Sequence, residues 1–268
     1  MEFSINFSTQ AAVLLDVGRL KLDRFKCPDW PDLIEEASHH RPVAVHFNLA
    51  AGRGKLTAKN LGRIAKLADR TRTPYINLHL EPKKRDFPDI AIDSSDPAQR
   101  ERVIHQALEE VLLAVDYFGR ERVILENAPY RPAGNLLRFA VEPEVIDRIV
   151  QETGCGLLLD LPHARISASH LGIPEQEYLA RLPVQRLKEL HFTGVMDFGG
   201  WLQDHVPAQP ADWIVLEWVL DNIRQGRWQR PWMLAFEYGG VGEAFTWRCS
   251  AQAIEGDGRR LYQLVNPL

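Results

Sequence analysis

Carboxylate and imidazole side chains stand at the ends of several apolar segments in this chain. The clearest case is segment 156–163, GLLLDLPH, in which an uncharged run leads to the carboxylate of Asp160 and then to the imidazole of His163. Continuous apolar runs are typical of buried strands in a parallel sheet. Carboxylate oxygens and imidazole nitrogens suit zinc, iron or manganese. The segment therefore predicts a strand whose end binds metal, although a capping Asp and a His on a loop would produce the same pattern.

The pattern of an apolar run followed by a possible ligand recurs along the chain. The residues at or just after such runs are His46, His79, Glu126, Asp160, His163, His191 and Glu237, and a loop before the last run adds Asp204 and His205. A single histidine of this kind is often a core residue, but the recurrence favours a shared metal site. Because one ion takes about three protein ligands, the set predicts about two or three divalent ions that share carboxylates.

Strand and helix signals alternate from one end of the chain to the other. Strands are expected at residues 3–7, 24–26, 42–47, 75–80, 123–126, 156–160, 187–192 and 232–237. Helices are expected at residues 11–15, 30–39, 57–68, 96–118, 143–153, 175–182, 212–224 and 250–265, with a long loop at 193–211. Eight strand–helix units in a chain of this length predict an α/β fold, a single (β/α)8 TIM barrel over residues 1–268. Barrel enzymes build their active sites at the strand ends, so the possible ligands should converge there.

Composition excludes several classes of protein. Of the 268 residues, 45% are hydrophobic and 25% are charged, as in an ordinary globular protein. No apolar run approaches the ~20 residues that cross a membrane, and the first residues do not resemble a signal peptide. The three cysteines are far apart, which favours a reducing cytoplasm over a disulfide framework. The net charge of −4 argues against a nucleic-acid partner.

Two further features are weaker candidates for function. The GRGK motif at residues 52–55 lacks the spacing of a P-loop. It could bind an anion, but a flexible surface loop is the favoured interpretation. His105 lies between Glu101 and Glu109 in a predicted helix, which indicates a solvated helix face.

Four segments resemble one known family. They are Leu125-Glu126-Asn127, the run that ends at Asp160, the segment 189–194 (ELHFTG) and the stretch 199–216. Within the xylose isomerase-like TIM barrels, which include sugar isomerases and endonuclease IV, these segments are similar to the multinuclear non-haem iron oxidative enzymes, formerly a domain of unknown function. His163 stands where that family usually has Asn, and its Asp-x-x-His spacing looks more like endonuclease IV. The family's Asp-x-His appears here as Gln203-Asp204-His205, which shifts Asp204 out of register.

The resemblance implies a reaction, a metal and a partner. It implies that two or three irons are held by His46, His79, Glu126, Asp160, His191, His205 and Glu237. It also implies that the enzyme uses oxygen to remodel a cysteine-containing peptide or small thiol, with a partner protein that presents the peptide. The candidate catalytic residues are Glu126, Glu237 and His163.

Three alternatives remain open on the sequence alone. The first is a sugar or sugar-phosphate isomerase or epimerase, in which Glu126 and Glu237 move a proton. The second is a zinc-dependent phosphodiesterase or endonuclease, which the net negative charge of the chain disfavours. The third is a barrel that only stores or senses metal. Manganese or zinc would replace iron in these cases.

Overall fold

The structure is a computed structural model, and it describes residues 1–267. The chain forms two compact units. Unit 1 contains residues 1–46, 71–73 and those from Lys188 onward, and unit 2 contains residues 47–70 and 74–187. The expectation of one domain over residues 1–268 stays a prediction.

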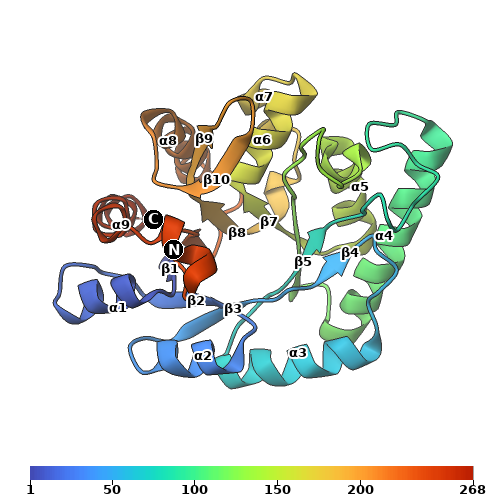
Figure 1. Ribbon diagram of the computed structural model, residues 1–268. Coiled ribbons are helices and arrows are strands. Elements are labelled where there is room, and N and C mark those ends of the chain that lie inside the picture. Colours follow the sequence, from blue (N-terminus) through green and yellow to red (C-terminus); the bar gives the residue numbers. More distant parts are fainter. Residues whose placement is uncertain (268) are drawn as a thin grey trace. The chain divides into compact units, whose positions relative to one another are not determined.

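Unit 1 is built on parallel strands in the order β3-β2-β1-β11-β8. Its strands are β1 (Glu2–Asn6), β2 (Arg24–Pro28), β3 (Val43–His46), β8 (Leu187–Phe192) and β11 (Met233–Phe236). Its helices are α1 (Thr9–Asp16), α2 (Pro31–Ser38), α8 (Pro210–Arg224), α9 (Ala251–Val265) and the 3-10 helix η3 (Glu243–Arg248). Figure 1 shows these elements in blue at the start of the chain and in orange to red at its end.

Unit 2 is built on parallel strands in the order β7-β6-β5-β4. They are β4 (Ala50–Ala51), β5 (Ile76–Leu80), β6 (Val123–Glu126) and β7 (Gly156–Asp160). The helices are α3 (Ala58–Thr71), α4 (Pro97–Phe118), α5 (Pro143–Thr153), α6 (Leu161–Leu171), α7 (Glu175–Ala180) and the 3-10 helices η1 (Arg138–Val141) and η2 (Val184–Arg186). All five residues of β7 are buried, as the apolar run predicted.

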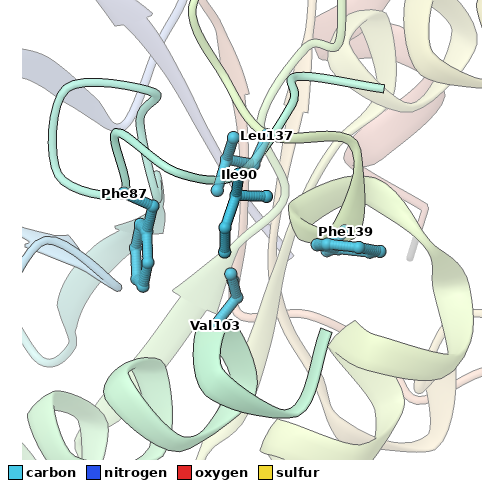
Figure 2. Packing of buried hydrophobic residues seen from close by; sticks show 5 residues of the cluster. All are labelled: Phe87, Ile90, Val103, Leu137 and Phe139. Carbon is cyan, nitrogen blue, oxygen red and sulfur yellow. The ribbon is translucent and has the colours of Figure 1, made fainter. Parts of the chain in front are cut away.

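The connection between β5 and α4 has its own small core. Phe87 and Ile90 pack in a buried cluster with Val103 of α4 and with Leu137 and Phe139 (Figure 2). The sequence predicted neither a strand nor a helix between residues 80 and 96. The apolar side chains of that loop are spaced irregularly, so periodicity alone did not reveal the cluster.

The eight predicted strands are all present, but two segments were assigned wrongly. No helix was predicted directly after the strand that ends at Asp160, whereas His163 lies in the first turn of α6. The helix forms because Asp160 caps its N-terminus, accepting from the His163 backbone N–H at 2.8 Å, and Gly172 ends it in the left-handed region at φ +67°. Its apolar pattern is interrupted by Arg165 and Ser167, which hid the helical period.

The second wrong assignment is the expected loop at 193–211. This segment contains an antiparallel hairpin of β9 (Gly194–Asp197) and β10 (Leu202–Val206). Gly199 and Gly200 lie between the strands with positive φ angles, the conformation that such turns require. The pairing shifts register between Gln203 and Val206, and such a bulge re-aims the side chains within it. Those side chains include the ligand candidate His205.

We expect the Gly194→Ala variant to disturb this hairpin. A Cβ atom at Gly194 would lie 2.2 Å from the Pro207 carbonyl oxygen and 2.8 Å from that of Val206, so backbone must move. Overpacking of this kind costs about 1–3 kcal/mol, which predicts a melting temperature lower by about 5 °C. Gly256→Ala in α9 is the control, because a Cβ there meets nothing within 4 Å and should raise stability slightly. Calorimetry that finds both variants equal to wild type would contradict the expectation.

Candidate metal centres

Three ligand candidates of unit 1 lie together at the carboxyl ends of its strands. His46 ends β3, His191 lies in β8 and Glu237 follows β11. One ligand atom from each lies within 4.8 Å of the others. The His191 Nδ1 atom is 3.1 Å from Glu237 Oε1, and the rings of His46 and His191 have centroids 5.4 Å apart. Parallel pairing explains the grouping, because β11 and β8 are neighbours with Ala235 opposite His191.

The hydrogen bonds of His191 determine which of its nitrogens can bind a cation. Its Nε2 atom lies 2.9 Å from Glu189 Oε1. Burial alone would raise the pKa of Glu189, but the neighbouring Lys26 and His191 outweigh burial and lower that pKa to about 2. An ionised carboxylate only accepts hydrogen bonds, so Nε2 carries the hydrogen. A neutral His191 then turns the lone pair of Nδ1 toward a second carboxylate, that of Glu237.

Two acceptors 3.1 Å apart in a buried site call for a cation between them. His191 is fully buried and Glu237 is 8% exposed. A proton on His191 or a metal ion would satisfy the pair. Two imidazoles and a carboxylate are a donor set that binds zinc or non-haem iron. The residues of unit 1 therefore fit a metal ion.

Glu189 is a candidate positioning residue that was not predicted from the sequence. It accepts from Trp232 Nε1 at 3.1 Å and pairs with the buried ammonium group of Lys26. A carboxylate behind a ligating histidine holds the ring and its tautomer, and such partners matter to metal affinity. The available signal was a charged residue inside a buried strand, two positions before His191 and therefore on the same face.

In unit 2, a second group forms where β6 and β7 end. Glu126, Asp160 and His163 each place one ligand atom within 4.8 Å of the others. The His163 Nδ1 atom lies 3.6 Å from Asp160 Oδ1 and 3.9 Å from Glu126 Oε1. Glu126 and Asp160 are almost fully buried. Two carboxylates and an imidazole again match zinc, iron or manganese.

Asn127 holds two of these ligands in place. Its side chain donates to the Asp160 carbonyl and accepts from the Asp160 N–H, both at 2.9 Å. Its own carbonyl oxygen lies 2.9 Å from His163 Nδ1. Because a carbonyl only accepts, Nδ1 carries the hydrogen. The 3.6 and 3.9 Å distances to the carboxylates therefore belong to a hydrogen-bond donor, and Nε2 is the nitrogen of His163 that could bind an ion. Asn127 stands in one of the segments that resemble the family, but no role was predicted for it. A polar residue directly after a ligand was the available signal.

His79 repeats the arrangement of His191. Its Nδ1 atom lies 3.1 Å from the Leu49 carbonyl oxygen, which assigns the hydrogen to Nδ1. Its Nε2 atom lies 3.1 Å from Glu126 Oε2. In a neutral His79, the lone pair of Nε2 would therefore face the Glu126 carboxylate. A cation bound between these two acceptors would remove their repulsion. His79 therefore fits the ligand role predicted from the sequence.

His205 and Asp204 are not in the ligand groups found among residues 1–267. His205 has φ +56°, and a non-glycine residue in that region stores about 1–3 kcal/mol of strain. Its Nδ1 atom lies 2.6 Å from the Glu237 carbonyl oxygen, and its backbone N–H donates to Thr193 Oγ1 at 3.2 Å. These two hydrogen bonds fix the His205 ring beside the ligand candidate Glu237. Nε2 is then the nitrogen of His205 that would bind a metal ion. Asp204 is buried and accepts from the Gln203 amide at 3.0 Å. Their ligand roles stay predictions, as does the convergence of all the ligand candidates.

A family model described as "RiPP precursor modification enzyme MbnB/TglH/ChrH" matches residues 27–226. This chain belongs to that family. The match covers every ligand candidate except Glu237 and confirms the resemblance to the multinuclear non-haem iron enzymes. A UPF0276 protein of Acaryochloris marina is 27% identical over 202 residues, which are 71% of this chain and 69% of that protein.

Two solved structures are similar over the whole chain. A structure of the IolI protein with a bound zinc atom has a TM-score of 0.60 and 14% identity, and covers 100% of this chain and 99% of its own. Endonuclease IV from Thermus thermophilus has a TM-score of 0.56 and 16% identity, and covers both chains fully. At these identities the likeness shows the fold, which confirms the predicted (β/α)8 barrel.

No helix among the described residues combines the length and apolar character that crossing a membrane requires. The cytoplasmic location stays a prediction.

Proposed function

We propose that this protein is an iron-dependent enzyme that oxidatively modifies a cysteine-bearing peptide or a small thiol. Membership of a family of precursor-peptide modification enzymes supports a peptide substrate. The observation that carries the proposal is the 3.1 Å contact between a histidine nitrogen and a carboxylate oxygen in each unit, His191 with Glu237 and His79 with Glu126. Such contacts are costly for neutral histidines unless a cation lies between the partners.

In this proposal the chain's own residues would hold the ions in defined positions. His46, His191 and Glu237 would bind one ion, and Glu126, Asp160, His163 and His79 would bind another, with His205 as a further ligand. Each bound ion would be neutralised in part by its carboxylates. About two or three ions in all is the expectation. Bound iron would supply the electron transfer to dioxygen that oxidation of a thiol requires.

The residues predicted to be catalytic take their roles from these positions. Glu126, Glu237 and His163 lie in the ligand groups, so they would act as metal ligands that orient the reacting atoms. Glu189 and Asn127 are positioning residues, because they act through His191 and through Asp160 and His163. The burial of Glu126, Asn127 and Glu189 keeps water from competing for the ligand atoms.

Metal analysis of protein purified without oxygen tests the proposal. We expect about two or three irons per chain and oxygen uptake on addition of a cysteine-bearing peptide. The same peptide with serine in place of cysteine is the control and should give no uptake. Full activity of protein loaded with zinc alone would refute the proposal.

Two control reactions separate the alternatives. Cleavage of a duplex with an abasic site would indicate a phosphodiesterase, and aldose–ketose exchange without oxygen would indicate an isomerase. The endonuclease IV likeness, at 16% identity, supports the fold alone, and the net charge of −4 disfavours DNA binding. A partner protein that presents the peptide stays a prediction.

A further inference from the structure

The loop after β4 is wrapped around a buried carboxylate. Five consecutive backbone N–H groups, those of residues 52–56, donate to the two oxygens of Glu110 on α4 at 2.6–3.0 Å. Gly52 and Gly54 have φ angles of +87° and +66°, and such alternation turns successive N–H groups toward one point. The sequence favoured a flexible surface loop here, and Gly54 and Lys55 are indeed exposed, but five hydrogen bonds tie the backbone of the loop to α4. The loop does bind an anion, but that anion is the chain's own Glu110, which is 4% exposed.

Only backbone N–H groups of the loop bind Glu110, so the basic side chains of Arg53 and Lys55 can interact with other groups. Arg53 and Lys55 pair with Asp86, at 3.4 and 3.2 Å. Arg85 also lies 4.0 Å from this carboxylate. Three cations therefore share Asp86, and the four side chains together carry a net positive charge. Lys55 is 59% exposed and can reach a ligand from solvent.

A cavity of 170 Å³ lies against these side chains. Its polar lining comes from Arg53, Lys55, Asn48 and Asn60. The Asn60 side-chain oxygen accepts from the backbone N–H and hydroxyl of Thr57, which leaves the amide –NH2 as its contribution to the cavity. The residues that line the cavity thus include an arginine, a lysine and two asparagines, and among residues 1–267 they include no Asp or Glu. Sites for whole small molecules are about 300–1,000 Å³, so this one suits a single side-chain-sized anionic group.

The cavity adjoins a residue of the proposed metal site. Leu49 also lines it, and the Leu49 carbonyl oxygen is the acceptor 3.1 Å from His79 Nδ1. A peptide anchored in the cavity would therefore have its neighbouring residues beside the His79 ring.

We propose that this cavity binds a carboxylate of the peptide substrate, from either an acidic side chain or the peptide's C-terminus. The inference rests on the proposed function in one respect, that the substrate is a peptide. Charge-assisted hydrogen bonds from Arg53 and Lys55 select the anion. The anchored carboxylate then orients the segment that enters the site.

Binding of thiol-free peptides to the full chain tests this independently of oxidation. The probes are acetyl-Gly-Glu-amide against acetyl-Gly-Gln-amide for the side chain, and acetyl-Gly-Gly acid against its amide for the terminus. Binding is followed through the NMR signals of arginine Nε–H groups in the zinc-substituted protein. We expect one of the two acids to bind about tenfold tighter than its neutral counterpart, and the pair that shows the difference identifies the source of the carboxylate.

Three variants are expected to weaken, to strengthen and to leave unchanged the binding of the acidic peptide. Arg53→Gln should weaken binding of the acid about tenfold. Asp86→Asn removes the competing carboxylate and should tighten binding about threefold. Arg120→Gln, at an exposed arginine that pairs with Glu121, should change nothing. Equal binding of acids and neutral peptides, or an Asp86→Asn variant that binds more weakly, would overturn the proposal. If the acids bind selectively but protein purified without oxygen contains no iron, the proposed function is refuted and this anion site still stands.

Discussion

The His191→Ala variant is expected to lose at least about a thousandfold in turnover, equivalent to about 4 kcal/mol of transition-state stabilisation, and one bound ion per chain. His191 is fully buried, and its Nδ1 atom faces Glu237 Oε1 at 3.1 Å. Removing the imidazole leaves only His46 and Glu237 in that group, fewer than the about three protein ligands that hold an ion. Elemental analysis and oxygen uptake on the same anaerobic preparation measure both effects.

His105→Ala is the matched control for this substitution. Its side chain is 76% exposed on α4 and pairs with Glu109 one turn away, so metal content and turnover should match wild type. A His191→Ala protein that keeps its full complement of metal would remove His191 from the ligand set. Normal metal binding by unit 2 in the same variant would show that the fold is intact.

Glu189→Gln is expected to lower the melting temperature by about 10 °C. Lys26 and Glu189 are 2% and 4% exposed, and removing one charge strands the other in the core at a cost of about 3–5 kcal/mol. For a protein of this size each kcal/mol shifts the midpoint by about 2–4 °C. The Lys26→Met/Glu189→Gln double variant should recover most of the loss, because no unpaired charge remains.

The same variants separate stability from metal binding. A glutamine amide can donate to His191 Nε2, and the ring hydrogen would then move to Nδ1, the nitrogen that faces Glu237. We therefore expect metal affinity to fall about 10–100-fold in both the single and the double variant. Calorimetry follows the first effect and competition with a chelator follows the second. Recovery of metal affinity in the double variant would show that Glu189 acts only through its charge pair with Lys26.

The strands could be predicted, and most ligand candidates could be chosen, because their signals are local. Buried parallel strands are short apolar runs, and β6, β7 and β8 begin and end at the predicted residues. A polar residue at the end of one such run can be a helix cap or a core residue, as the cap of α6 by Asp160 shows, but its recurrence at several strand ends favours a shared site. The ligand candidates found in this way were His46, His79, Glu126, Asp160, His191 and Glu237.

Contacts between distant segments were not predictable from the sequence. Glu189 meets Lys26 across 163 positions, and Glu110 meets the 52–56 loop from 58 positions away at Gly52. No local period distinguishes a carboxylate that receives five N–H groups from one that faces water. The helix α6 and the hairpin of β9 and β10 were also not predicted, because their burial depends on neighbouring segments that only the fold brings together.

By itself, the sequence determined the alternation of strands and helices, the barrel class and the residue types at the strand ends. These follow from hydrophobic periodicity, which each segment carries alone. Tertiary structure decided which nitrogen of His191 and His79 can bind a cation, which carboxylates hold the ligands, and where the cavity beside Leu49 lies. Those properties depend on which hydrogen-bond donor meets which acceptor, and the chain brings those partners together only when it folds.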